Sequence, residues 1–349
     1  MTPAAPRQSH AAFDYRHLAF AAPSLAALAY PFLLKAFNAA VTAAGGAIDA
    51  MAAALLALVL LSPAVALWSA ARLGALDHPS RGELLAKRIA LLAFAAPPIF
   101  TFMGVLLYMA KGPVPDEAPW TVFWLLALVA SGFGALARPT YIRTEMAPPS
   151  SKLRVVHGVT AAVLILLFLV MHLTNHLSAR WSLAAQKTLM ADFRAIYRAP
   201  LVEPVIVALF LFQVATGSAL LWAWSRGPAD LFRTLQLCTG AYLIFYITGH
   251  MNSVFVFARG YLKIQTDWNF ATGAPAGLIK DAWNIRLLPH YFFGVACVAT
   301  HLLLGARGVA LAYGANRATL DRLTVAGIGA SLALAAAIVI GMTGVHLAR

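Results

Sequence analysis

Three apolar stretches in the second half of the chain carry histidines: VVHGVTAAVLILLFLVMHLTNHL (155–177), TGAYLIFYITGHMN (239–252) and LPHYFFGVACVATHLLLGAR (288–307). An ionisable side chain inside a membrane is costly, so it marks a functional site by default. Histidine is also the commonest metal ligand among side chains, and it holds haem iron in many proteins. The interpretation of the whole chain depends on these imidazoles.

The composition is that of an integral membrane protein. The mean hydropathy is +0.76, 61% of the residues are hydrophobic and 11% are charged, whereas about a quarter of a soluble chain is charged. A membrane-spanning helix needs about 20 apolar residues, and all its backbone groups must bond internally. We therefore predict an all-α polytopic transmembrane bundle of about nine spans, at 17–38, 49–71, 88–110, 119–137, 153–177, 202–224, 234–257, 286–305 and 323–347.

The net charge of +13 is explained by loop lysines and arginines that set membrane orientation, and we expect no nucleic-acid partner. With nine spans, fifteen of the 26 Lys and Arg residues fall on the side of the N-terminus. The expected partner is a lipid membrane. We expect this to be a bacterial inner membrane, with the N-terminus of the chain in the cytoplasm and the C-terminus outside.

The chain has two cysteines, Cys238 and Cys297, and both fall inside predicted spans. No CxxC or CxxCH motif occurs, which excludes a cysteine-ligated iron–sulfur cluster within this chain and covalent attachment of a c-type haem. We interpret both cysteines as small packing residues.

The chain divides near residue 150, after a link rich in Pro and Ser. Residues 1–150 hold four spans of unknown role, and residues 151–349 hold five spans with all the buried histidines. Two loops on the expected outer side are long. Residues 178–200 have apolar residues near helical spacing between basic ones, which predicts an interfacial amphipathic helix. Residues 258–285 form either a lid over that end of the bundle or an ordinary connection.

Depth along the helices predicts which imidazoles meet. With a rise of 1.5 Å per residue, His172 and His250 lie about 8 and 10 Å from the outer ends of their spans. We call these two, with His290 and the shallower His176, the His172 layer. His157 and His301 lie about 6 Å from the inner ends of theirs and form the His301 layer.

Two such layers suit two stacked haems, each held by two imidazoles from facing helices. His290 and His301 are eleven residues apart, a rise of about 16 Å, and glycines on these spans leave room for a porphyrin face. In the alternative, each histidine only bonds a neighbouring helix. A zinc site is disfavoured, because carboxylates and cysteines do not accompany the histidines.

Over about 150–310 the chain resembles the membrane-anchor cytochrome b subunits of succinate dehydrogenase and fumarate reductase, especially the single-chain type with five helices and two haems. The first helix of that family ends in a haem-ligating histidine after an apolar run, which corresponds to His172 in LLFLVMHLTNHL. The fourth carries Thr-Gly and then a histidine ten residues after the glycine, which corresponds to Thr239, Gly240 and His250. The resemblance implies that His172 and His250 hold one haem b.

The fifth helix of the family has a histidine, a glycine four residues later and then an arginine, which corresponds to His301, Gly305 and Arg307. The second ligand of that haem comes from the second helix, where this chain has Gln213. Glutamine is a poor ligand for haem iron. Either His157 supplies the missing ligand from the same layer or the inner haem is absent, so we expect one or two haems.

Related subunits also use a Ser/Arg pair at the corresponding end of their first helix to bind quinone. Ser150 and Arg154 stand four residues apart at that end of this chain. The resemblance thus implies a quinone site there, while the alternative for Arg154 is an interfacial anchor.

The sequence predicts a membrane b-type cytochrome that passes electrons between quinone and a partner, which could be a soluble flavoprotein or iron–sulfur protein or a signalling protein. By itself the chain would be at most an electron-transfer subunit of an oxidoreductase, because it has no GxGxxG loop and no cluster ligands. Two alternatives stay open. One is a non-catalytic membrane anchor or haem-based sensor subunit. The other is a transporter or proton pathway that uses the buried histidines, which inverted repeats and broken helices would favour. The sequence shows neither of these features.

Overall fold

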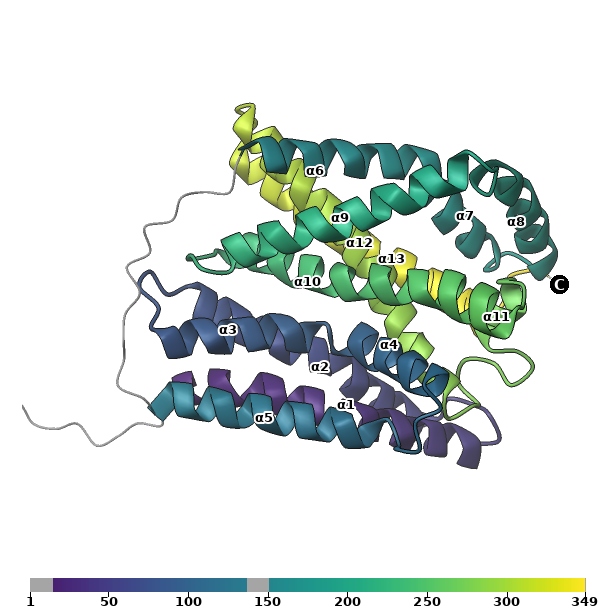
Figure 1. Cartoon of the computed structure of the whole chain (residues 1–349), viewed down its shortest axis with the longest axis horizontal. Coiled ribbons are helices and arrows are strands. Elements are labelled where there is room, and N and C mark those ends of the chain that lie inside the picture. Colours follow the sequence, from purple (N-terminus) through teal and green to yellow (C-terminus); the bar gives the residue numbers. More distant parts are fainter. Residues whose placement is uncertain (1–14, 137–150, 349) are drawn as a thin grey trace, which may run out of the picture.

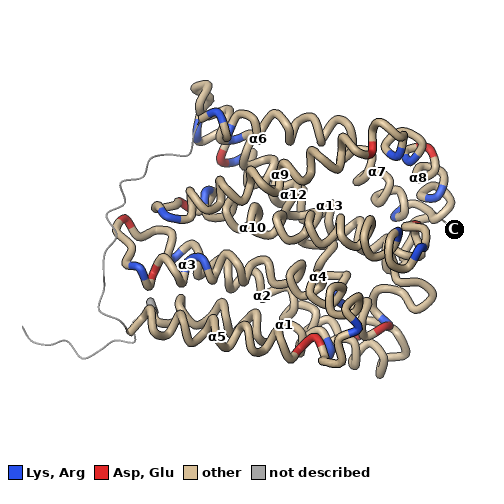
Figure 2. Tube along the Cα trace, viewed as in Figure 1, with Lys and Arg blue, Asp and Glu red and all other residues tan. Residues whose placement is uncertain are grey.

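The computed structural model describes residues 15–136 and 151–348, and its elements are all helices (Figure 1). Eight of them are long and apolar enough to cross a membrane, or nine spans result if one bent pair counts as a span. Charged residues gather toward the two ends of the bundle, and the middle lengths of the helices are largely free of them (Figure 2). The predicted all-α polytopic bundle of about nine spans is confirmed.

The first region packs as a layer of helices on one side of the molecule (Figure 1). The predicted boundary near residue 150 lies outside the described residues. Aromatic rings fill the centre of this layer, and Trp120 donates from its indole Nε1 to the carbonyl oxygen of Ala27 at 2.7 Å. The helices are α1 (Tyr15–Ala43), α2 (Ala50–Gly74), α3 (Arg81–Phe94), α4 (Ala96–Met109) and α5 (Glu117–Leu136).

The span predicted at 88–110 is broken. Helices α3 and α4 meet at Ala95 with a bend of 67°. Pro97 and Pro98 follow at once; proline has no N–H for the helix ladder, and its ring clashes with the carbonyl of the preceding turn. The expectation that no span is broken was wrong, because Pro97 and Pro98 interrupt the helix inside a run that is otherwise apolar enough to span.

The second region contains the histidine-bearing helices, and two of its spans include π-helical segments, η1 and η2. The predicted amphipathic helix at 178–200 is present as α8, and both cysteines are buried as predicted. The elements are α6 (Ser151–Leu164), η1 (Ile165–Leu169), α7 (Val170–Ser178), α8 (Leu183–Tyr197), α9 (Val202–Trp224), α10 (Leu231–Met251), η2 (Asn252–Leu262), α11 (Trp268–Thr272), η3 (Asn284–Arg286), α12 (Leu287–Ala312) and α13 (Arg317–Met342).

Helix α10 joins the two regions. It packs against α9 and α12 of its own region and against α2, α3 and α4 of the first. One continuous core therefore includes Phe94 and Trp120 from the first region together with Tyr242 and Cys297 from the second. The Tyr242 hydroxyl donates to the carbonyl oxygen of His290 at 2.9 Å, which fixes α12 beside α10.

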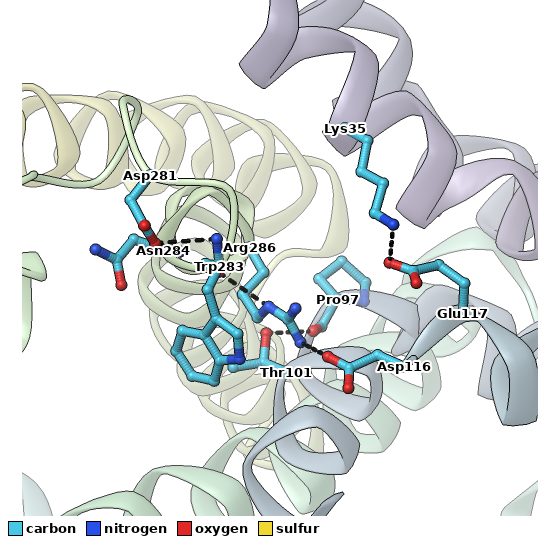
Figure 3. A network of polar contacts seen from close by, with 9 residues as sticks. All are labelled: Lys35, Pro97, Thr101, Asp116, Glu117, Asp281, Trp283, Asn284 and Arg286. Carbon is cyan, nitrogen blue, oxygen red and sulfur yellow. Dashed lines mark hydrogen bonds and ion pairs between the residues drawn. The ribbon is translucent and has the colours of Figure 1, made fainter. Parts of the chain in front are cut away.

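A buried ion pair also ties the regions together (Figure 3). The Arg286 guanidinium, whose side chain is 7% exposed, donates to the Asp116 carboxylate at 2.6 Å. It lies 4.6 Å from the ring centroids of both Phe100 and Trp283. Because Arg286 is one helical turn before His290, this contact sets where α12 begins.

Replacing Asp116 with Ala should lower the free energy of unfolding by about 3 kcal/mol, because it leaves the Arg286 charge buried without a partner. Thermal unfolding of the purified protein in detergent measures the loss. The matched control is Glu117→Ala, which breaks the neighbouring pair to Lys35, a side chain that is 58% exposed, and should cost less than about 1 kcal/mol. Equal losses of stability in the two variants would show that the buried Arg286–Asp116 pair does not hold the two regions together.

Candidate functional site

His172 and His250 lie together, as the comparison of depths predicts. The centroids of their rings are 6.0 Å apart and the ring planes make an angle of 77°. The His176 ring is one turn beyond His172 on α7, with its centroid 4.8 Å away. Two imidazoles on opposite sides of one metal, each with a nitrogen about 2 Å from it, would have centroids roughly 6 Å apart.

The two π-helical segments flank this pair. Segment η1 ends three residues before His172, and η2 begins two residues after His250. A π turn holds an extra residue, so it turns the helix that follows by about 100° relative to an unbroken α-helix. Sequence periodicity does not reveal such turns, so the face on which each histidine lies could not be predicted.

Aromatic rings stack on both histidines. Phe168 lies over His172, with centroids 4.8 Å apart and planes at 25°, and Tyr246 lies over His250 at 5.6 Å and 14°. Tyr246 also contacts His290 at 4.6 Å. His290 is buried, and its Nδ1 has no hydrogen-bond partner. His290 thus belongs to the His172 layer by depth, but the Tyr246 ring lies between it and His250.

A cavity of about 240 Å³ opens beside His172, His176 and His250. Helix α8 covers it with Arg194 and Arg198, among others. Residues 266–268 and 270–271 of the second long loop also line it, and Trp268 is only 8% exposed. Both long loops therefore close the end of the bundle over the His172 layer, which favours the lid over the ordinary connection.

In the His301 layer, each histidine bonds a threonine that precedes a glycine on a neighbouring helix. His157 Nδ1 lies 2.8 Å from Thr216 Oγ1, and His301 Nδ1 lies 3.0 Å from Thr239 Oγ1. A Cβ on the following glycine would lie 3.4 Å from the His157 ring at position 217 and 3.2 Å from the His301 ring at position 240. A side chain at 217 would thus touch the His157 ring at an ordinary contact distance, whereas one at 240 would press on the His301 ring, which would have to shift by a few tenths of an ångström.

The two contacts lie at one depth. Thr216 is eight residues before the end of α9, and Thr239 is eight residues after the start of α10. A short loop joins these helix ends, so both threonines lie about 12 Å from the same side of the bundle. The structure therefore brings His157 and His301 to one level on adjoining helix pairs.

The threonine hydroxyls also bond their own helices. Thr216 Oγ1 lies 2.7 Å from the carbonyl oxygen of Phe212, and Thr239 Oγ1 lies 2.9 Å from that of Leu235. A hydroxyl that donates its single hydrogen to this carbonyl accepts from the imidazole, and Nδ1 then carries the ring hydrogen. That tautomer leaves the Nε2 lone pair free, which is the arrangement of a metal-ligating histidine held by an outer partner.

Gln213 is fully occupied in helix packing. Its Nε2 donates to the His157 carbonyl oxygen at 2.8 Å and to Thr160 Oγ1 at 2.7 Å. It ties α9 to α6 one turn from Thr216. Helix α9 carries no histidine, so a second imidazole for this layer would have to come from His157.

Of the two residues of the predicted quinone pair, the structure describes only Arg154. Ser150 lies outside the described residues. Arg154 is exposed at the first turn of α6, and Arg307, from the family motif, pairs with Asp321 at 2.7 Å. The exposure of Arg154 fits the interfacial anchor as well as a quinone site at the membrane edge.

Sequence reasoning missed Thr216, Tyr246 and the arginines of α8. Thr216 could have been found from the Thr-Gly pair, which occurs at both 216–217 and 239–240. Within the described residues, no three His, Cys, Asp or Glu side chains gather as metal ligands. A haem needs only two ligands from the protein, because the porphyrin supplies four.

Comparison of the chain with models of known protein families, with curated proteins and with solved structures finds no match. The resemblance to the cytochrome b anchor subunits thus depends only on the sequence residues quoted for it.

Proposed function

We propose that the chain is a membrane b-type cytochrome that passes electrons between quinone and a partner. The observation that carries this proposal is the His172–His250 pair, two imidazoles from different helices with centroids 6.0 Å apart beside a cavity. Haem, when bound, would supply an iron that takes up and gives off one electron. His172 and His250 would hold the iron, and the protein would also supply the apolar shell and the hydrogen bonds that tune the potential.

The donor chemistry fits haem. The imidazoles come in pairs from different helices, and within the described residues no third His, Cys, Asp or Glu side chain gathers with them as a metal ligand, which suits a porphyrin iron better than a tetrahedral zinc site. The cavity is smaller than the roughly 300–1,000 Å³ of drug-sized ligand sites. A porphyrin would therefore have to displace Phe168 from its stacked position on His172.

His157 and His301 are proposed as the ligands of a second haem. Both have a free Nε2, a threonine that orients the ring and a glycine beside it. His250 and Thr239 are eleven residues apart on α10, as His290 and His301 are on α12, a separation of about 16 Å. Two stacked haems would then form a path along the bundle.

Such a carrier needs a donor and an acceptor. We propose that one of these is a membrane quinone, bound at the end of the bundle near Arg154, and that the other is a soluble flavoprotein, iron–sulfur or signalling protein. We further propose that the chain lies in a bacterial inner membrane with its N-terminus in the cytoplasm. A quinol gives up two electrons and two protons when it becomes a quinone, which suits a site at the membrane edge where protons reach water and an arginine can donate to a carbonyl oxygen of the quinone.

One observation favours a second candidate function, a transporter or proton pathway. The broken span at Ala95 is a feature of transporters. Residues 93–98 around the break are all buried, however, so the break does not form an open binding site. A transporter also gives no reason for the His172–His250 pair. Proton uptake by liposomes that contain the purified protein, without any haem absorbance, would support this candidate.

Replacing His172 or His250 with Ala should each remove one haem, seen as a loss of reduced-minus-oxidised absorbance, because one imidazole alone cannot complete the six-coordinate iron. His290→Ala is the matched control: it removes a buried histidine of the same layer that Tyr246 separates from the pair, and haem content should stay unchanged. Full haem content in both His172 and His250 variants would rule out this pair.

His301→Ala should remove one of two haems per chain. Thr239→Val keeps the shape of the side chain but leaves His301 Nδ1 without its acceptor, and should weaken binding of that haem by about 10–100-fold. Thr248→Val is the control on the same helix, since the Thr248 hydroxyl bonds only the carbonyl of Ile244. Haem analysis per chain measures all three. A wild-type protein with one haem that His301→Ala retains would show that the inner site is absent.

Arg154→Ala should slow the reduction of haem by added quinol at least several-fold and leave the absorbance spectrum intact. Stopped-flow absorbance measures the rate, with Lys152→Ala as a control for loss of charge at the same helix end. Reduction at the wild-type rate would mean that Arg154 is only an interfacial anchor.

A further inference from the structure

The wall of the cavity formed by α8 is basic. Arg194 and Arg198 are four residues apart, so they share one face of the helix end, and both line the cavity. Both also bond Thr266 in the second long loop: Arg194 donates to its carbonyl oxygen, and Arg198 donates to its Oγ1 at 2.5 Å. These contacts fix the two guanidinium groups at the mouth of the cavity.

No carboxylate in the described part of the chain forms an ion pair with either arginine. The nearby Glu203 uses both oxygens on Arg259, at 2.7 and 3.2 Å, and Asp267 caps α11 through its Oδ1. The Nε of Arg194 is buried and has no hydrogen-bond partner. An unsatisfied buried donor is costly, and more so on a charged group, so this wall is built for an anion.

A ligand that fills the cavity would contact the basic wall of α8 on one side and the His172–His250 pair on the other. The Tyr197 ring, on the same helix end, contacts Phe168 at 5.3 Å, and Phe168 stacks on His172. A molecule held by the imidazoles and by the arginines needs a flat apolar body that binds a metal and carboxylates along one edge. Iron protoporphyrin has this form, with two carboxylates on one edge of the ring.

We propose that Arg194 and Arg198 bind the two carboxylates of the haem held by His172 and His250. This assignment depends on the proposed function. A guanidinium bonds a carboxylate through two parallel N–H groups, so helix α8 sets which way the porphyrin edge faces. The other source of the same chemistry is a small soluble dicarboxylate.

The test compares two porphyrins. The full chain is produced in haem-deficient cells, purified in detergent and titrated with iron protoporphyrin or with its dimethyl ester, which lacks the negative charges. The wild type should bind the free acid at least about tenfold more tightly than the ester. Arg194→Ala/Arg198→Ala should lose this preference and keep the wild-type affinity for the ester, which shows that the variant is folded. Lys187→Ala, an exposed cation on the same helix, should keep the preference.

Equal binding of acid and ester by the wild type would overturn the assignment and leave the His172–His250 site standing. An increase in the melting temperature with malonate that the double variant lacks, together with equal binding of the two porphyrins, would overturn it in favour of a soluble dicarboxylate. Failure of the wild type to bind either porphyrin would overturn the proposed function itself.

Discussion

The half-buried imidazoles of the His301 layer each have a hydrogen-bond partner on a neighbouring helix. Thr216 Oγ1 and Thr239 Oγ1 lie within hydrogen-bond distance of His157 Nδ1 and His301 Nδ1, and each hydroxyl also bonds a carbonyl of its own helix. In the tautomer in which each hydroxyl accepts from Nδ1, the imidazole offers Nε2. The glycine after each threonine lets the ring lie close to the neighbouring helix. The proposed inner haem site depends on this Thr-Gly pair, which occurs on two helices.

The first region acts on the site through α10 and α12. Its helices share a core with Tyr242 and Cys297, and the buried Arg286–Asp116 pair fixes the beginning of α12 one turn before His290. Helix α10 carries both Thr239 and His250, so its position sets both layers at once. The described part of the first region thus covers one face of α10 and contacts the beginning of α12.

The sequence predicted much of this arrangement, because hydropathy and a fixed rise per residue determine which side chains share a depth. His172 and His250, and likewise His157 and His301, could be matched from position alone. The rotation of each helix could not be predicted, since the π-helical segments η1 and η2 change it without a periodic signal. The break at Ala95 could have been found from Pro97 and Pro98. The basic wall of α8 could not be predicted, because a loop distant in the sequence helps to form the cavity that this wall faces.

The most direct test of the central claim is the electron paramagnetic resonance spectrum of the oxidised protein, purified with its natural cofactor content. His172 and His250 have ring planes at 77°, and nearly perpendicular imidazoles on a ferric haem give a low-spin signal with strong g-anisotropy. We predict that signal, and its loss in His172→Ala and in His250→Ala. A protein purified without haem, or a high-spin signal from an iron with one axial ligand, would contradict the account.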